Sequence, residues 1–364
     1  MFFTLTPQKH LSNLLILSRC FQKNILVLNF FDLQSLSPKT LLSLRESVQK
    51  SMQANLIELL VIDITGDPEK IENPDSLVTI KQLANNLSTL INTVIVTEDF
   101  NYYYQPADGI RYFPYGLWIA ATKSVHLYYS YQDTAYDTAL EKTQPIMCFN
   151  RNLVWHRLYL FSLIANKSWF NKIKYSFISK LGDRLDSPYG IKRFLTTDEI
   201  EAIRCHGQLL PIQVEEEKNV GRVPVMYNNG ATSVNDPTHT TTAINLVTET
   251  SLTEGVVLTE KTAKPFMAYQ IPILLGPVGA NQFLEDIGLD MFSDYIPWKT
   301  WDHIEDHKLK IRMIVNFLHD LLSGSTAESN ILSAHRQFHT RLIRNKEYFH
   351  STEFENILLQ QLKS

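Results

Sequence analysis

Two carboxylates and two lysines are concentrated in one short stretch of this chain. Glu249 closes an apolar run, and Glu260, Lys261 and Lys264 follow it after a spacer, where a helical pattern begins. A lysine binds phosphate as a point charge, whereas a carboxylate accepts hydrogen bonds from sugar hydroxyls. A helix start adds free N–H groups and the positive end of the helix dipole. The stretch therefore predicts a site for a ligand that carries both phosphate and hydroxyl groups.

The elements that would position these residues are a strand, a helix and a second strand. Apolar runs at 245–249 and 271–275 predict the two strands. In an open α/β sheet, ligands bind beyond the carboxyl ends of the strands, which is where the first carboxylate would lie. The sequence allows two starting positions for this helix. Thr259 can cap a helix that begins beside it, or Pro265 can delay the start by disfavouring helical dihedrals at Lys264.

These residues resemble the donor-binding region of glycosyltransferases related to the fucosyltransferases. In that family a strand ending in glutamate precedes a Thr-Glu-Lys triplet, a helix and an apolar, proline-containing strand that leads to glycine. The matching residues are Glu249, Thr259-Glu260-Lys261, Ile271-Pro272-Ile273 and Gly276. Further matches are Phe283 to Leu289, Trp301-Asp302 and, upstream, Cys148-Phe149-Asn150-Arg151 followed by His156-Arg157. The resemblance runs from Ile146 to about His319 and leaves the N-terminal half unmatched.

The resemblance implies a GT-B type α/β fold, in which two Rossmann-like domains face each other across a cleft. It also implies that Glu260 holds the ribose of a nucleotide sugar, that Lys261 holds its phosphates, and that Arg151 contacts the diphosphate. The asparagine that the family places beside the first glutamate is Thr250 here, and the helix carries an extra Lys-Pro. We therefore do not transfer fucose specificity to this chain.

A second predicted strand end contributes basic residues. Arg151 follows the apolar run 146–149, and arginine there suits bidentate recognition of phosphate. The predicted donor-binding residues are Arg151, Arg157, Glu249, Glu260, Lys261 and Lys264. Each also has an ordinary structural explanation, such as a solvated helix face for His156 and Arg157 or a loop cap for Glu249.

An inverting glycosyl transfer needs a general base near the acceptor hydroxyl. Glu98 and Asp99 end a predicted strand of the N-terminal half and are the candidate catalytic residues on position alone; capping of the loop is their alternative role. No Asp-x-Asp pair follows a strand, and His156 has no second ligand at helical spacing. We therefore expect no metal and no cofactor, with the nucleotide sugar as a substrate and cations facing its diphosphate.

Length and composition predict two globular domains. The chain has 364 residues, of which 44% are hydrophobic and 20% charged. We expect an N-terminal α/β domain on the acceptor side at 1–144, a C-terminal α/β domain on the donor side at 145–325, and a C-terminal helical extension at 326–364 that can fold back over the N-terminal domain. Alternating strands and helices predict parallel sheets.

The predicted elements follow from apolar runs and capping signals. In the N-terminal half, strands are expected at 24–31, 56–64 and 92–96. In the C-terminal half, strands are expected at 146–149 and 173–178, and helices at 153–164, 196–204, 281–287, 303–322 and over most of 326–364. The aromatic-rich stretch 101–136 is explained either by packing or by an acceptor cleft whose rings stack on sugars; packing is the simpler explanation.

Charge, hydropathy and cysteine usage limit the partners and the compartment. The net charge of −4 gives no overall positive charge of the kind that nucleic-acid binding uses. No apolar run reaches the ~18–20 residues of a membrane span, and the first residues lack a signal-peptide pattern. The three cysteines are scattered, without a CxxC spacing, which fits a reducing compartment. We expect a cytoplasmic protein, with a peripheral contact to the inner membrane surface left open.

The sequence thus predicts a glycosyltransferase that moves a hexosyl or fucosyl group from a nucleotide sugar to a glycan or other hydroxyl acceptor. We expect inversion at the transferred carbon and no metal. A noncatalytic nucleotide- or carbohydrate-binding protein on the same fold is the alternative. A third hypothesis is a structural or assembly protein whose aromatic stretch contacts a protein partner.

Overall fold

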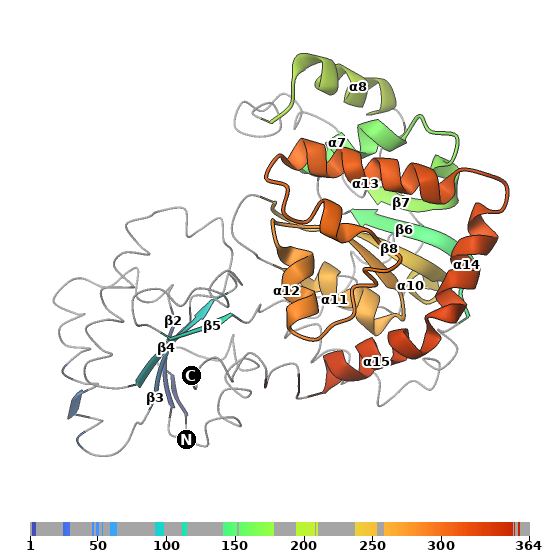
Figure 1. Cartoon of the computed structure of the whole chain (residues 1–364). Helices are drawn as coiled ribbons and strands as arrows, with labels where there is room; N and C mark the ends of the chain where they lie inside the picture. The colour runs from blue at the N-terminus through green and yellow to red at the C-terminus, as the bar shows by residue number, and fades with distance from the viewer. Residues whose placement is uncertain are drawn as a thin grey trace. The chain divides into compact units, whose positions relative to one another are not determined.

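The computed structural model contains two parallel β-sheets (Figure 1). It describes residues 141–150, 153–177, 194–207, 209, 237–252, 258–351, 353 and 356, and, before residue 141, five strands and residues 46, 49, 50 and 53. The chain divides into two compact units. The first comprises Met1–Ala121, Glu254–Val257 and Thr352–Ser364; the second comprises Thr122–Thr253 and Leu258–Ser351.

The sheet of the first unit has five strands, and every neighbouring pair is parallel. The strands are β1 (Phe2–Thr4), β2 (Ile25–Asn29), β3 (Leu59–Asp63), β4 (Asn92–Thr97) and β5 (Arg111–Pro114). Their order in the sheet is their order in the chain. A doubly wound Rossmann-like sheet instead reverses its strand order at a switch point. The prediction of a parallel sheet is confirmed. The five described strands show no such reversal, and the Rossmann-like description of this half stays a prediction.

In the first unit, the strands that the sequence predicted correctly are those that lie in long apolar runs. Strands β2 and β3 lie within the ranges expected for them, and β4 extends one residue beyond its range. Strands β1 and β5 were not expected, because segments of three and four residues are too short to show a hydrophobic period.

The sheet of the second unit has four parallel strands in the order β7-β6-β8-β9. They are β6 (Gln144–Asn150), β7 (Ile173–Phe177), β8 (Thr242–Thr248) and β9 (Ile271–Leu275). The register places Ile146 of β6 opposite Ile173 of β7 and Ile244 of β8. Every residue of β8 and β9 is buried, as expected for parallel strands covered on both faces. This order is compatible with a Rossmann-like fold.

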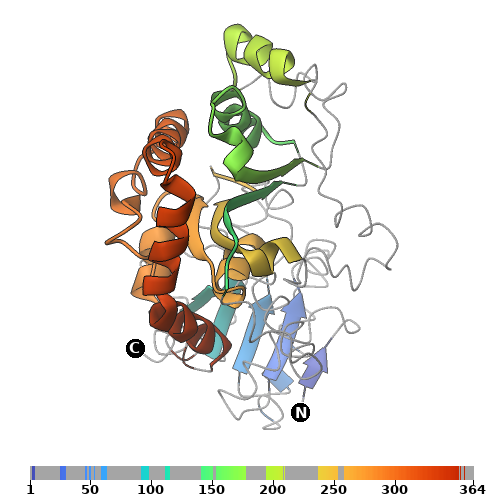
Figure 2. The ribbon, with the colours of Figure 1, turned by 90° about the vertical axis from the view of Figure 1, so that its right-hand side faces the viewer.

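Eight α-helices surround this sheet in the described residues. They are α7 (Trp155–Ile164), α8 (Thr197–Gly207), α10 (Pro237–Thr241), α11 (Glu260–Met267), α12 (Ala280–Asp286), α13 (His307–Leu322), α14 (Ala327–Gln337) and α15 (His339–His350). Helix α7 packs against α13, whereas α11 packs against β8, β9 and α15 (Figure 2). Strands β7 and β9 lie on opposite sides of the β6–β8 pair, so right-handed crossovers place α7 and α11 on opposite faces. None of the described helices is long and apolar enough to cross a membrane.

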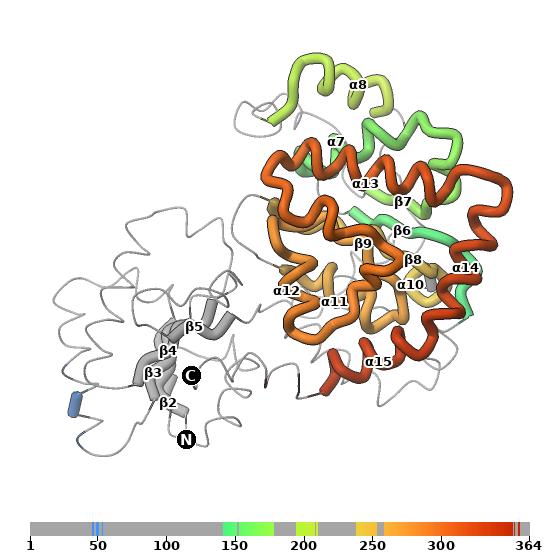
Figure 3. The backbone as a smooth tube through the Cα atoms, viewed as in Figure 1, coloured from blue at the N-terminus to red at the C-terminus, as the bar shows by residue number. Residues whose placement is uncertain are grey.

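The helices of the C-terminal extension pack on the second unit (Figure 3). Helix α14 contacts β6 and β8, and its His335 donates from Nε2 to the carbonyl oxygen of Tyr269 at 2.7 Å. Helix α15 contacts α11 through the stacked rings of Phe349 and Phe266, whose centroids are 6.1 Å apart. Helices α14 and α15 thus belong to the second unit, whereas Thr352–Ser364 is grouped with the first. That the extension folds back over the N-terminal domain stays a prediction.

Capping residues fix the helix starts in the second unit. Thr259 is the N-cap of α11, so the helix begins at Glu260 and contains Pro265. Helix α13 begins at His307 rather than at 303, because the Asp306 side chain accepts hydrogen bonds from the N–H groups of its first turn.

Candidate functional site

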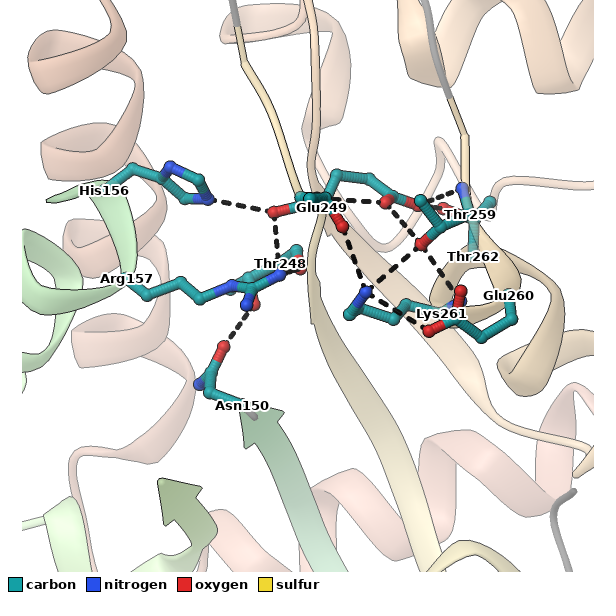
Figure 4. A network of polar contacts seen from close by, with 10 residues as sticks. Asn150, His156, Arg157, Thr248, Glu249, Thr259, Glu260, Lys261 and Thr262 are labelled. Atoms are coloured by element: carbon teal, nitrogen blue, oxygen red, sulfur yellow. Dashed lines mark hydrogen bonds and ion pairs between the residues drawn. The ribbon is translucent and has the colours of Figure 1, made fainter. Parts of the chain in front are cut away.

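The strand order of the second unit reverses between β6 and β8. The chain leaves β6 through α7 toward β7, and it leaves β8 through α11 toward β9. In α/β sheets, ligands bind outside the carboxyl ends of the strands at such a switch point. Asn150 ends β6 and Thr248 ends β8, and the Thr248 hydroxyl donates a hydrogen bond to Oδ1 of Asn150 (Figure 4). The two strand ends are thus joined directly.

The carboxylate of Glu249 lies inside the protein and links β8 to α11. Glu249 has 0% of its surface exposed. Its carboxylate accepts hydrogen bonds from the backbone N–H of Thr250 at 3.2 Å and of Thr259 at 3.0 Å. It also accepts from the hydroxyl of Thr259 at 2.7 Å and from the hydroxyl of Thr262 (Figure 4). An internal carboxylate therefore occupies the positive end of α11, which the sequence suggested as a phosphate site.

Two side chains of α7 hold the main chain at the same strand end. His156 Nε2 lies 2.9 Å from the carbonyl oxygen of Glu249. Arg157 Nη2 donates to the carbonyl oxygens of Thr248 at 2.9 Å and of Glu249 at 3.0 Å. Both side chains are buried. These contacts join α7 to the end of β8, across the switch point.

Burial sets the protonation of these two groups. Desolvation, and then the neighbouring Arg157 charge, lower the pKa of His156 to about 3. His156 is therefore neutral at pH 7, and its Nε2 carries the hydrogen that is donated to the carbonyl. Desolvation also lowers the pKa of Arg157, which the Glu249 carboxylate opposes, but a guanidinium remains charged in proteins.

The ammonium group of Lys261 lies at the partly exposed side of this cluster. Its Nζ is 3.2 Å from the Thr250 hydroxyl, 3.4 Å from the Thr259 hydroxyl and 3.3 Å from Oε1 of Glu260. The Lys261 side chain is 22% exposed and that of Glu260 14% exposed, in contrast to the buried Glu249. Glu260 and Lys261 are thus the partly exposed side chains of this cluster.

The charges of the described cluster balance one another. Arg157 and Lys261 are opposed by Glu249 and Glu260, and His156 is neutral. A phosphate bound at Lys261 would therefore compete with Glu260 for the ammonium group, or require a further cation.

The structure brings together Arg157, Glu249, Glu260 and Lys261 of the predicted donor-binding residues (Figure 4). Lys264 lies in α11 and is partly exposed. Arg151, Glu98 and Asp99 lie outside the described residues. Ligand contact stays a prediction for each of them. What the structure shows for Glu249 and Arg157 is an internal role, in which they position the strand end and the helix start.

Sequence reasoning missed the residues that complete the network. Asn150, Thr259 and Thr262 were not singled out as site residues, although Thr259 was expected as a helix cap. Thr262 lies three residues after the N-cap Thr259, and this spacing could have indicated the second hydroxyl that donates to Glu249. In the part of the chain that the structure describes, no group of three or more His, Cys, Asp or Glu side chains could hold a metal ion.

Comparison of this chain with known proteins identifies no family for it. No family model, no curated protein and no solved structure matches the chain. The resemblance to the fucosyltransferase-related enzymes therefore rests on the motifs alone and stays a prediction.

Proposed function

We propose that the second unit binds a nucleotide sugar at the carboxyl ends of β6 and β8, and that the protein is a glycosyltransferase. The observation that carries this proposal is the partly exposed Lys261 side chain beside a strand-order reversal. Phosphate-bearing ligands bind at this place in open α/β sheets. The motif around Glu260 and Lys261 supports a nucleotide-sugar donor in particular.

In the proposed reaction, the anomeric carbon–oxygen bond to the diphosphate breaks as the acceptor oxygen attacks from the opposite face, with inversion. Negative charge then grows on the departing diphosphate, where a fixed cation stabilises the transition state most. Lys261 supplies that cation, with Arg151 as the proposed second one, and Glu260 accepts from the ribose hydroxyls. Glu98 or Asp99 is the proposed base that takes the acceptor proton. We propose that side-chain cations act without a divalent metal, so transfer should persist in EDTA.

The buried part of the cluster would act as a support for these groups. Glu249 fixes the start of α11, and therefore the backbone that carries Glu260 and Lys261. Arg157 and His156 fix the backbone of Glu249 itself. Positioning groups in this way reduces the reorganisation needed when a ligand binds.

The test is the affinity of a Lys261→Ala variant for nucleoside diphosphates, measured by isothermal titration calorimetry with UDP, GDP, CDP and dTDP. A hydrogen bond to a charged group contributes about 1.5–3 kcal/mol, so Kd should rise about tenfold to hundredfold for the diphosphate that the wild type binds. Lys299→Ala, at a lysine whose side chain is 59% exposed, is the matched control and should leave Kd unchanged. Equal affinity in wild type and Lys261→Ala would contradict the proposal.

A noncatalytic nucleotide-binding protein is the second candidate function. The observation that favours it is that both carboxylates of the described cluster are engaged, Glu249 by four donors and Glu260 by Lys261. Donor hydrolysis and transfer to a labelled acceptor distinguish the two functions. Turnover in either assay supports the transferase, whereas tight diphosphate binding without turnover of any nucleotide sugar supports the binding protein.

A further inference from the structure

The ammonium group of Lys261 has an oxygen within hydrogen-bonding reach for each of its N–H groups. An ammonium group carries three N–H donors. Three oxygens lie within 3.4 Å of Nζ, namely the hydroxyls of Thr250 and Thr259 and Oε1 of Glu260 (Figure 4). A phosphate that binds Lys261 must therefore replace at least one of these three partners.

The two hydroxyls differ from the carboxylate in charge and in the other contacts they make. The Thr259 hydroxyl donates to the Glu249 carboxylate and accepts from the backbone N–H of Lys261, so it belongs to the cap of α11. Thr250 is exposed, and its hydroxyl can turn to donate to a phosphate beside Lys261. Glu260 is the partner whose charge opposes a phosphate.

The ion pair between Glu260 and Lys261 is not imposed by the helix that carries it. Successive residues of an α-helix point about 100° apart, so side chains at i and i+1 do not face each other. Both side chains are partly exposed, and either can turn away without moving the backbone of α11. The Glu249 carboxylate, in contrast, is buried and held by four donors. Of the two carboxylates, Glu260 is therefore the exchangeable one.

Displacing Glu260 from Lys261 has different consequences for different ligands. The displaced carboxylate lies beside the phosphate that has taken its place, and like charges at such separations repel each other. A ligand that carries hydroxyl groups next to its phosphates can donate hydrogen bonds to that carboxylate, because an ionised carboxylate is an acceptor only. A ligand without hydroxyl groups there breaks the ion pair and gives the carboxylate no new partner.

We propose that Glu260 is a specificity-determining residue, which makes Lys261 select ribonucleotides over phosphate ligands that lack ribose hydroxyls. The inference rests on the proposed function and deepens it, because it gives the Glu260–Lys261 pair a role in choosing among phosphate-bearing ligands. The selection combines a contact with the right ligand and a penalty on the wrong one. Free phosphate and pyrophosphate fall in the penalised class.

The experiment compares two ligands on wild type and Glu260→Gln. They are the nucleoside diphosphate that the wild type binds and its 2′,3′-dideoxy form, which keeps the base and the phosphates but has no ribose hydroxyl. A partly exposed ion pair changes an equilibrium constant by up to about fivefold. Calorimetry should show that Glu260→Gln binds the dideoxy form about twofold to fivefold more tightly than wild type does. The ribonucleotide should bind no more tightly, because a neutral amide is a weaker acceptor than a carboxylate.

Glu201→Gln is the control for the loss of one negative charge. Glu201 of α8 forms an exposed ion pair with Arg204 at 3.6 Å, outside the cluster around Lys261. Both Kd values should therefore equal those of wild type. Glu260→Gln keeps the shape of the side chain, and its urea midpoint checks that the variant folds like wild type.

Three results would overturn the specificity role, and they separate it from the proposed function. Unchanged or weaker binding of the dideoxy form by Glu260→Gln refutes the penalty, while the phosphate site at Lys261 stands. Equal tightening for both ligands means that Glu260 repels anions without choosing among them. Absence of nucleoside diphosphate binding by the wild type refutes the proposed function, and the specificity role with it.

Discussion

At the scale of single residues, the buried carboxylate of Glu249 is the group that links the elements of the candidate site. A buried carboxylate is tolerated only where donors and an opposite charge compensate for its lost hydration. Here four hydrogen bonds reach it, and Arg157 is its electrostatic partner. Glu249 therefore holds the cap residue Thr259 and the hydroxyl of Thr262 at the first turn of α11.

Glu249→Gln should lower the free energy of unfolding by about 1–3 kcal/mol. The amide NH2 would face groups that are themselves donors, leaving at least one hydrogen bond unmade in a buried place. Urea unfolding followed by circular dichroism measures the change. Glu260→Gln is the control and should cost less than about 1 kcal/mol, because its ion pair with Lys261 is partly exposed. Wild-type stability in Glu249→Gln, combined with loss of nucleotide affinity, would mean that the carboxylate binds the ligand itself.

The sequence predicted part of the cluster, namely Arg157, Glu249, Glu260 and Lys261, but not which way each side chain faces. Glu260, Lys261 and the cap at Thr259 follow one another in the chain, so local capping rules placed them. The inward orientation of Glu249 depends on contacts with α7, such as that of His156, 93 residues away in the chain. Capping and periodicity contain no information about contacts of that separation.

At the scale of elements, long apolar runs and capping residues placed most of the second unit. All four strands of its sheet overlap predicted runs, because parallel strands covered on both faces are almost continuously apolar. The start of α11 was left open between two positions, and Thr259 decides it. The short β1 and β5 were missed because they offer too few residues for a pattern.

Helix α12 depends on a cap that comes from a distant residue. Its N-cap position is Gly279, which has φ +79° and no side chain to bind the first N–H groups. The buried Asp302 performs that role, accepting from the N–H of Asn281 at 3.1 Å and of Gln282 at 2.9 Å. The same carboxylate accepts from Nδ2 of Asn281 at 2.7 Å. The start of α12 is therefore tied to the segment that precedes α13.

Asp302→Ala should lower the free energy of unfolding by about 1–3 kcal/mol, since it removes a cap and leaves buried donors unpaired. Urea unfolding at pH 7 measures the loss. Asp320→Ala, at an exposed position of α13, is the matched control and should change stability by less than about 0.5 kcal/mol. Equal stability of the two variants would show that α12 does not need this cap.

At the scale of the whole molecule, the alternation of strands and helices predicted parallel sheets but not their strand order. The order depends on the side of the sheet to which each crossover returns, and local patterns do not encode that side. In the second unit the order reverses between β6 and β8 and creates the candidate site. In the first unit the five described strands follow chain order, without such a reversal among them.

Two buried histidines make the stability of the second unit depend on pH. His156 and His335 each donate from Nε2 to a backbone carbonyl, at 2.9 Å and 2.7 Å. Burial is the main reason that the pKa of His156 falls to about 3 and that of His335 to about 4. Nearby cations lower both values further: Arg157 and Lys261 act on His156, and Lys142 and Arg336 act on His335.

The sign of the effect follows from the unfolded chain, in which histidine has a pKa of about 6.5. Below that pH the unfolded state binds protons that the folded state does not, so folding stability falls as pH falls from about 6.5 toward 4. Each histidine contributes up to about 1.4 kcal/mol per pH unit in this window.

His156→Gln and His335→Gln keep a donor without a titrating group, so each should flatten the decline, and the double variant most. Urea midpoints at half-unit pH steps measure the slope, with His303→Gln, at an exposed position, as the control. A double variant as acid-sensitive as the wild type would show that these histidines accept protons without unfolding.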